Sequence, residues 1–167
     1  MSTTTAFDHE KLWQLIKGIK FGMFTHRHSS GMLHSQPLTT QNKALDEGAT
    51  LYFFVSRKGE VASHIAEDDH VNVAYANPSD DSYVSISGQA AIVEDQEKKE
   101  SLWSPMAKAW FPGGPTDPDL ALLLVRISHA EYWDVTESKM VQLVKMAAAA
   151  VTGTPPQMGE HKEMRVS

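Results

Sequence analysis

The segment from Ser82 to Val93 constrains the fold more than any other part of the sequence. Its apolar side chains recur at every second position, at Val84, Ile86, Ala90 and Ile92. Polar side chains occupy intervening positions, at Ser85, Ser87 and Gln89. A period of two predicts a strand with one face on the core and one in water, which is typical of antiparallel sheets. Gly88 falls on the apolar face and indicates a β-bulge or a closely approaching backbone.

Other segments have the composition of strands, and short turns join most of them. We expect further strands at 21–28, 32–40, 51–55, 71–76 and 120–135. The turn residues Ser29-Ser30-Gly31 join the first two into a hairpin. A doubly wound α/β sheet would need helices between most strand pairs, and the pattern lacks them. The sequence therefore predicts a small antiparallel barrel in a mainly β (α+β) fold.

Helical patterns occupy the ranges 7–20, 61–65, 95–110 and 137–151. Ser104-Pro105 should break the third helix, with Ser104 capping a second segment. Gly153 should end the fourth. One face of that last helix is apolar and consists of Met140, Leu143, Val144, Ala147 and Val151. We predict a single domain over 1–153 and a polar C-terminal tail over 154–167.

The charge balance and the lack of cysteine exclude several classes of protein. A net charge of −6 without a basic stripe argues against nucleic-acid binding. With no cysteine there is no disulfide, no thiolate metal site and no thiol nucleophile. No secretory signal is visible, and no apolar run approaches the roughly 20 residues that span a bilayer. We expect a soluble cytoplasmic protein with no nucleic-acid or membrane partner.

The stretch from Leu51 to Ile65 combines a strand, a basic turn and the start of a helix. Ser56 ends the strand, and Arg57, Lys58 and Gly59 follow before the helical pattern begins. Hydroxyl, cationic and backbone N–H groups ahead of a helix N-terminus suit a bound phosphate. A solvated turn between strand and helix explains the same residues, so both interpretations stand.

Three histidines in the predicted hairpin are candidates for a metal site. His26 and His28 share one face of their strand, and His34 lies on the facing strand. No carboxylate accompanies them in the sequence, and exposed histidines on strands are common. We therefore predict no metal site. The sequence also lacks Ser-His-Asp, nucleophile-elbow, G-x-G-x-x-G and Walker patterns.

Aromatic side chains gather in two late segments. Trp103, Trp110 and Phe111 lie within nine residues, where they could pack on the barrel, bound a flat aromatic ligand or form a dimer surface. Tyr132 and Trp133 are adjacent in a predicted strand and must face opposite sides. One of them should be buried, and the other should be available to a ligand or partner.

With these motifs in order, the chain resembles the general stress proteins of the pyridoxamine 5′-phosphate oxidase-like, FMN-binding split-barrel superfamily. The resemblance runs from Leu12 to Gly153. It is carried by YFFVSR, YVSISGQA, LWSPMAKAWFPGGPTDPDLALL, and AEYWDV followed by the final helix. It implies a six-stranded antiparallel split β-barrel with flanking helices. It also implies a homodimer that binds FMN, or else FAD, in a cleft at the subunit interface.

The resemblance further implies which residues contact the flavin. The strand HSQPLT would follow the ring and ribityl chain, with contacts from His34, Ser35, Gln36, Pro37, Leu38 and Thr39. The end of the next strand would lead to the phosphate through Phe54, Val55 and Ser56, and the nearby cations of this chain are Arg57 and Lys58. Aromatic contacts would come from Tyr83 and from Trp133, the latter from the partner subunit. From the late aromatic segment we add Trp103 and Trp110 as candidate contacts.

Two departures from the family pattern concern the phosphate. Gln36 stands where many relatives have arginine, and Val61, or Glu60 with a one-residue gap, stands where they have lysine. FMN phosphate carries close to two negative charges, so losing a direct cation costs roughly a few kcal/mol of charge-assisted bonding. We expect Arg57 and Lys58 to have taken over this role. Weak affinity and a different ligand, such as FAD, are the alternatives.

These observations leave three hypotheses for function. The first is a flavin-dependent oxidoreductase of the general stress type, with an unknown substrate and no assigned catalytic residue. It would not be a true pyridoxamine phosphate oxidase, because the basic residues for that substrate lack clear counterparts apart from Lys139. The second is a non-enzymatic flavin carrier or sensor in the stress response. The third is an enzyme that holds another cofactor, such as haem or a deazaflavin, in the same barrel.

Overall fold

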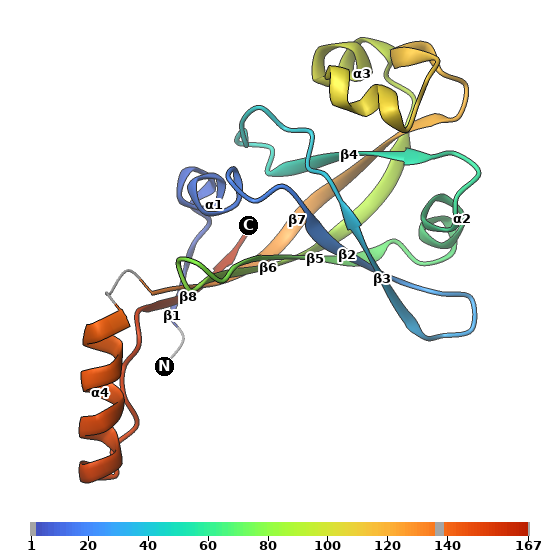
Figure 1. The fold of residues 1–167 in the computed structure, drawn as a ribbon. Coiled ribbons are helices and arrows are strands. Elements are labelled where there is room, and N and C mark those ends of the chain that lie inside the picture. Colours follow the sequence, from blue (N-terminus) through green and yellow to red (C-terminus); the bar gives the residue numbers. More distant parts are fainter. Residues whose placement is uncertain (1–2, 136–138, 167) are drawn as a thin grey trace.

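The computed structural model describes residues 3–135 and 139–166. Within these residues, one strongly curled sheet forms the body, and helices lie around it (Figure 1). The strands are β1 (Thr3–Ala6), β2 (Gly22–Arg27), β3 (Leu33–Leu38), β4 (Thr50–Ser56), β5 (His70–Asn77), β6 (Ser82–Val93), β7 (Leu120–Asp134) and β8 (Glu160–Arg165). The helices are α1 (His9–Ile16), α2 (Glu60–Glu67), α3 (Gln96–Leu102) and α4 (Lys139–Thr152), with 3₁₀ helices η1 (Pro105–Ala109) and η2 (Gly114–Thr116).

Strands β2 to β7 form the split barrel that the sequence predicts. They are antiparallel and follow the order β4-β7-β6-β5-β2-β3. The two ends of this series meet just beyond β3, where Thr40 pairs with Phe53 of β4. The Gln41 N–H also donates to the Tyr52 carbonyl at 2.8 Å. Before this point β3 and β4 diverge, and their divergence is the split in the barrel.

Gly88 marks an irregularity in the long β6–β7 pair, as its place in the apolar pattern predicts. The register shifts between Ser87 and Gly88, where the two backbones come very close. A Cβ atom on Gly88 would lie 2.2 Å from the carbonyl oxygen of Arg126. Glycine is therefore required here by a neighbouring backbone, which confirms the close-approach interpretation.

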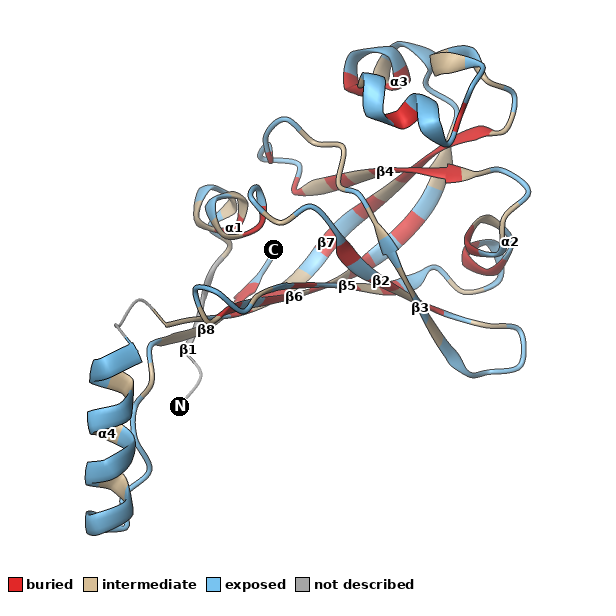
Figure 2. Ribbon diagram, in the orientation of Figure 1, coloured by how far each residue is buried: buried red, intermediate tan, exposed pale blue. Residues whose placement is uncertain are grey.

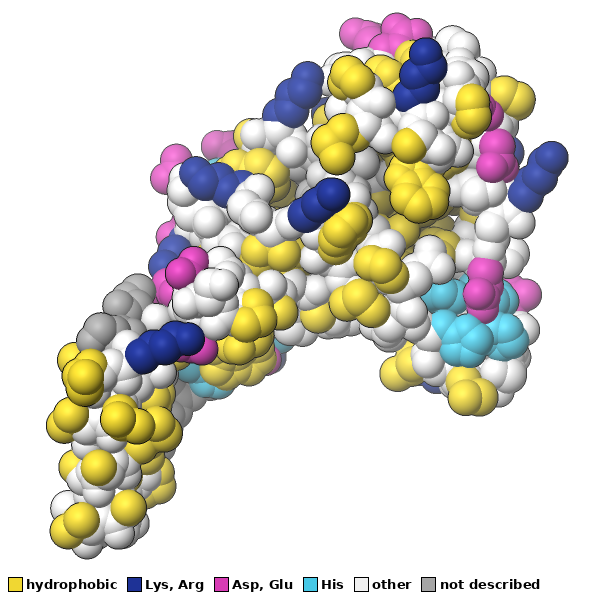
Figure 3. Space-filling model, in the orientation of Figure 1, with side chains coloured by type: hydrophobic (Ala, Val, Ile, Leu, Met, Phe, Trp, Pro, Cys, Tyr) yellow, Lys and Arg dark blue, Asp and Glu magenta, His cyan; other side chains and the backbone are white. Residues whose placement is uncertain are grey.

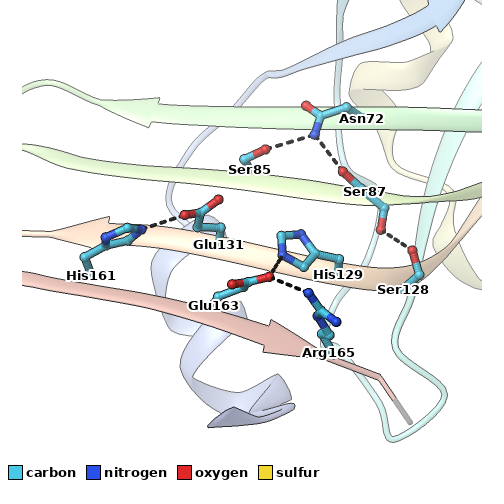
Figure 4. A network of polar contacts seen from close by, with 9 residues as sticks. All are labelled: Asn72, Ser85, Ser87, Ser128, His129, Glu131, His161, Glu163 and Arg165. Atoms are coloured by element: carbon cyan, nitrogen blue, oxygen red, sulfur yellow. Dashed lines mark hydrogen bonds and ion pairs between the residues drawn. The ribbon is translucent and has the colours of Figure 1, made fainter. Parts of the chain in front are cut away.

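The polar face of β6 belongs to a network of side chains on one side of the sheet (Figure 4). The Asn72 amide on β5 donates to the hydroxyls of Ser85 at 2.9 Å and Ser87 at 3.1 Å. Further along the same face, ion pairs link β7 to β8. His129 contacts Glu163 and His161 contacts Glu131, each at 2.6 Å.

Strand β8 extends the sheet into the segment that the sequence marks as a polar tail, residues 154–167. It pairs antiparallel with β7 and parallel with β1, and its Met164 is fully buried in the main core. The sequence of β8, EHKEMR, has no alternating apolar residues, and the strand is attached by its backbone pairing, by His–Glu contacts with β7 and by a single buried methionine. The second half of the tail therefore continues the sheet of the domain.

Two apolar clusters make up the interior (Figure 2). The larger fills the barrel, and the smaller lies under α3 and η1, around Phe54, Leu102, Phe111 and Leu120. Helix α3 ends at Leu102 and η1 begins at Pro105, so the predicted break at Ser104-Pro105 is confirmed. Ser104 occupies the cap position of η1, but its side chain makes no capping hydrogen bond.

Helix α4 stands away from the barrel at the far end of the sheet (Figures 1 and 2). Its predicted start at residue 137 lies outside the described residues, while its predicted end at Gly153 is confirmed by a φ of 69° and an N–H bond to the Ala149 carbonyl. The apolar face of α4 is exposed, with Leu143 61%, Val144 62% and Val151 87% accessible. Among the described helices, none combines the length and apolar character needed to cross a membrane.

Candidate functional site

A cavity of about 480 Å³ opens where β3 and β4 diverge. Its walls come from β3, the end of β4, the start of α2 and the segment around η1. Hydrophobic side chains border a hollow on the face of the molecule shown in Figure 3. The lining residues are Phe21, Gln36, Pro37, Leu38, Thr39, Gln41, Phe54, Val55, Ser56, Gly59, Glu60, Val61, Ala107, Trp110, Phe111 and Asp119.

Strand β3 contributes its edge to the cavity. It is the last strand in the sheet order, so its side toward β4 is available along Gln36 to Thr39. Pro37 fits such an edge because it has no backbone N–H to leave unpaired. The hydroxyl of Ser35 lies 2.6 Å from that of Thr25 on β2, and Ser35 does not line the cavity.

The turn between β4 and α2 is organised around Asp119, which follows η2. The Ser56 hydroxyl donates to its carboxylate at 2.7 Å, and the Lys58 N–H donates at 3.3 Å. The Ser56 hydrogen bond holds the pKa of Asp119 below its usual range, so this carboxylate is ionised at neutral pH. Asp119 thus places a fixed negative charge at the end of the cavity.

Arg57 does not line the cavity. Its guanidinium forms an ion pair with Glu94 and reaches the carbonyls of Pro118 and Leu120 at 3.4 Å each. The lining side chains that carry charge are Glu60 and Asp119, and among the residues that the structure describes no lysine or arginine lines the cavity. Arg57 therefore ties the end of β4 to the end of β6, where Glu94 follows.

The acidic groups of the cavity are poorly suited to general-base catalysis. A hydrogen bond from His34 lowers the pKa of Glu60, and Asp119 is stabilised as described above. A carboxylate with a lowered pKa holds its negative charge but is a weak proton acceptor at neutral pH. The cavity therefore offers binding and orientation and does not assemble an acid–base pair.

The aromatic residues of the late segments divide between the core, this cavity and a second cavity. Trp103 packs in the smaller core cluster, with its ring 5.9 Å from that of Phe54, whereas Trp110 is 81% exposed and lines the main cavity. Tyr132 is 2% exposed and Trp133 37%, so the prediction that one is buried and the other accessible is confirmed.

The second cavity, of about 320 Å³, lies over β2, β5 and β6. Phe21 lines both cavities and so lies between them. Tyr75 forms part of the second wall, and burial raises the pKa of its phenol to about 12. Its hydroxyl bonds that of Thr40 beside the closing bridge. The exposed aromatics of this cavity are Phe21, Tyr83 and Trp133.

The structure thus brings together part of the predicted site. The main cavity collects Gln36, Pro37, Leu38, Thr39, Phe54, Val55, Ser56 and Trp110, and the second collects Tyr83 and Trp133. Outside both lie His34, Ser35, Arg57, Lys58 and Trp103. Sequence reasoning missed Phe21, Gln41, Ala107 and Asp119 as lining residues, whereas Phe111 belongs to the aromatic segment that it considered as a wall for a ligand. Among the four missed residues, Asp119 carried a signal, as the acidic turn residue just ahead of the longest strand.

Comparisons with known proteins agree with this architecture. The family model described as pyridoxamine 5′-phosphate oxidase like matches residues 8–157. Protein bli-3 of Neurospora crassa is 27% identical over an alignment of 157 positions, which covers 87% of this chain and 73% of that protein.

Two crystal structures are similar along most of their length. The general stress FMN/FAD binding protein of Xanthomonas citri is 32% identical, with a TM-score of 0.67 and coverage of 78% of this chain and 90% of that one. The general stress protein 26 candidate of Jannaschia sp. CCS1 is 23% identical, with a TM-score of 0.73 and coverage of 94% and 97%. The chain therefore belongs to the pyridoxamine 5′-phosphate oxidase-like family, among its general stress proteins.

Proposed function

We propose that this protein binds a flavin, FMN or FAD, in the cavity between β3 and β4. The observation that carries the proposal is the position of the cavity at the split of the barrel, against the edge of β3 and the end of β4. The similarity to the FMN/FAD binding protein of Xanthomonas citri supports it. A volume of about 480 Å³ with mostly apolar walls suits a flat ring system.

The walls suggest how the ring would be held. Phe54, Val55 and Val61 are buried and present a rigid apolar surface. The backbone from Gln36 to Thr39 would meet the polar edge of the ring through the N–H and C=O groups of an edge strand. The exposed Trp110 is placed to cover the ring from the opposite wall.

The turn from Ser56 to Gly59 would receive the phosphate. Helix α2 begins at Glu60, and the peptide N–H groups of a helix N-terminus favour an anion. Lys58 is the cation that we assign to the phosphate, because Arg57 is engaged by Glu94. The carboxylates of Glu60 and Asp119 repel the negative charge of the phosphate. The flavin ring should therefore supply most of the binding affinity.

A bound flavin would supply electron-transfer chemistry. This chain would bind and orient it, and Glu60 and Asp119 would keep negative charge near its phosphate end. We place the protein as a flavin-dependent oxidoreductase of unknown substrate. The alternative is a non-enzymatic carrier or sensor, which the weak basicity of both carboxylates favours. Steady oxidation of NADH or NADPH by the flavin-loaded protein would support the oxidoreductase and count against the carrier.

We also propose that the protein is a homodimer with the flavin at the subunit interface. Helix α4 exposes a row of large apolar side chains, and the second cavity exposes Tyr83 and Trp133. Exposed apolar surface of this extent is typical of an interaction surface. The dimer would cover α4 and would bring a second subunit against the cavities.

Comparing FMN with riboflavin tests the binding and the position of the phosphate. We expect saturable FMN binding at micromolar or lower concentration by flavin fluorescence. Lys58→Ala should weaken FMN binding about tenfold, the scale of a lost charge-assisted contact, and should leave riboflavin binding unchanged. Lys17→Ala removes the same charge from the end of α1 and serves as the control. If Lys58→Ala weakened the binding of FMN and riboflavin equally, the assignment of Lys58 to the phosphate would be contradicted. If the wild type bound no FMN, the proposed flavin binding would be contradicted.

A further inference from the structure

Four histidines and one glutamate meet where the β2–β3 hairpin packs against α2. His26 on β2 lies opposite His34 on β3, and His28 follows the end of β2. Glu60 and His64 are one turn apart on α2 and point the same way. The histidine patch, bordered by acidic side chains, is visible in cyan on the right of Figure 3.

One carboxylate oxygen lies at the centre of this cluster. Glu60 Oε1 is 2.8 Å from His34 Nδ1, 3.6 Å from His64 Nδ1 and 3.7 Å from His28 Nε2. In a tetrahedral zinc site with bonds near 2 Å, neighbouring ligand atoms are about 3.3 Å apart. The observed separations are therefore close to those of ligands around a shared ion.

The buried half of the cluster has unsatisfied polar atoms. His26 is 2% exposed and His64 is 8% exposed. The Nδ1 atoms of both rings are buried without a hydrogen-bond partner. An unpartnered buried nitrogen costs free energy that a bound ion would recover.

We infer that this cluster binds one divalent transition-metal ion through His26, His64 and Glu60, with His28 or His34 as the fourth ligand. The ligand atoms of the first three lie within 4.8 Å of one another, and so do those of His28, His34 and Glu60. Imidazoles with one carboxylate select zinc, nickel, copper or iron over calcium and magnesium, which prefer oxygen ligands.

The sequence alone argued against a metal site because no carboxylate accompanies the hairpin histidines. The structure removes that objection, since α2 supplies Glu60 together with a fourth histidine. It also corrects the expectation of exposed histidines, because His26 is buried. Glu60 lines the cavity between β3 and β4 as well, so an ion bound here would reduce the negative charge of that wall.

Metal titration of the full-length chain, freed of any polyhistidine tag and stripped with a chelator, tests this inference without reference to flavin. We expect one Zn²⁺ per chain by calorimetry, with micromolar or tighter affinity. Co²⁺ should give the intense visible absorption of a tetrahedral site. Glu60→Gln and His64→Gln should each weaken Zn²⁺ binding at least about tenfold. Glu60 has a side chain that is 46% exposed, so its variant is expected to fold even where His64→Gln does not.

His70→Gln is the matched control, because His70 forms a separate exposed cluster with Asp68 and Asp69. It should leave the affinity and the Co²⁺ spectrum unchanged. The inference would be overturned by a wild-type chain that binds no stoichiometric metal, or by a Glu60→Gln variant that binds as tightly as the wild type. Loss of Zn²⁺ binding in His70→Gln would also overturn the inference, because it would place the site at the cluster of Asp68, Asp69 and His70.

Discussion

Gly88→Val is expected to prevent folding, or to lower the free energy of unfolding by at least about 3 kcal/mol. A Cβ atom at this position would lie 2.2 Å from the Arg126 carbonyl oxygen and 3.2 Å from the Ile127 Cα, both of them backbone atoms. Neither can rotate away, so β6 and β7 must separate where they form the barrel wall. Urea unfolding followed by tryptophan fluorescence measures the effect.

Gly18→Ala is the control for this substitution. A Cβ atom at Gly18 meets nothing within 4 Å, so the free energy of unfolding should change by no more than about 0.5 kcal/mol. If Gly88→Val had the same midpoint of urea unfolding as the wild type, the backbones of β6 and β7 could not approach each other as closely as described.

Replacing Leu143 and Val144 together by lysine is expected to convert the proposed dimer to monomers. Both side chains are more than half exposed on the apolar face of α4 and would be buried by a partner. Burial of each is worth roughly 1.5–3 kcal/mol, so losing both should raise the dimer dissociation constant at least about 100-fold. Sedimentation or light scattering measures the change. FMN binding should weaken in parallel, because the flavin is proposed to lie at the interface.

Ala149→Lys with Thr152→Lys adds the same two charges on a different side of α4 and should leave the dimer intact. Positive charge near the C-terminus of a helix interacts favourably with the helix dipole, so these substitutions should not destabilise α4 itself. A wild-type chain that is already monomeric, or a Leu143→Lys and Val144→Lys variant that stays dimeric, would contradict the proposed interface.

Much of the barrel follows from local patterns in the sequence. The alternation in β6, the long apolar run of β7 and the turn residues of the β2–β3 hairpin each specify an element without reference to the rest. The break at Ser104-Pro105 was predictable for the same reason, because a proline acts through its own backbone. These features depend on residues that are neighbours in the sequence. Gly88 was predictable from its place in the alternation of β6, although the backbone that requires glycine there belongs to β7.

The features that were not predicted depend on contacts between distant segments. Strand β8 is attached by backbone pairing to β7 and β1, by His–Glu contacts with β7 and by one buried methionine, so its sequence carries no period of two. The ion pair of Arg57 with Glu94, which follows β6, was also not predicted. The histidine cluster is assembled only when α2 packs against the hairpin. No spacing within one segment could have indicated these partners.

The central claim is that flavin occupies the cavity between β3 and β4, and a titration of FMN into a cavity-filling variant tests it most directly. Thr39 is exposed and lines the cavity, so Thr39→Trp adds bulk there without disturbing the core. Leu33→Trp adds the same ring to an exposed position of β3 outside the cavity. We predict saturable binding by the wild type and by Leu33→Trp, and binding at least about tenfold weaker by Thr39→Trp, the scale of one lost contact. Wild-type affinity in Thr39→Trp, or no saturable binding by the wild type, would contradict the claim.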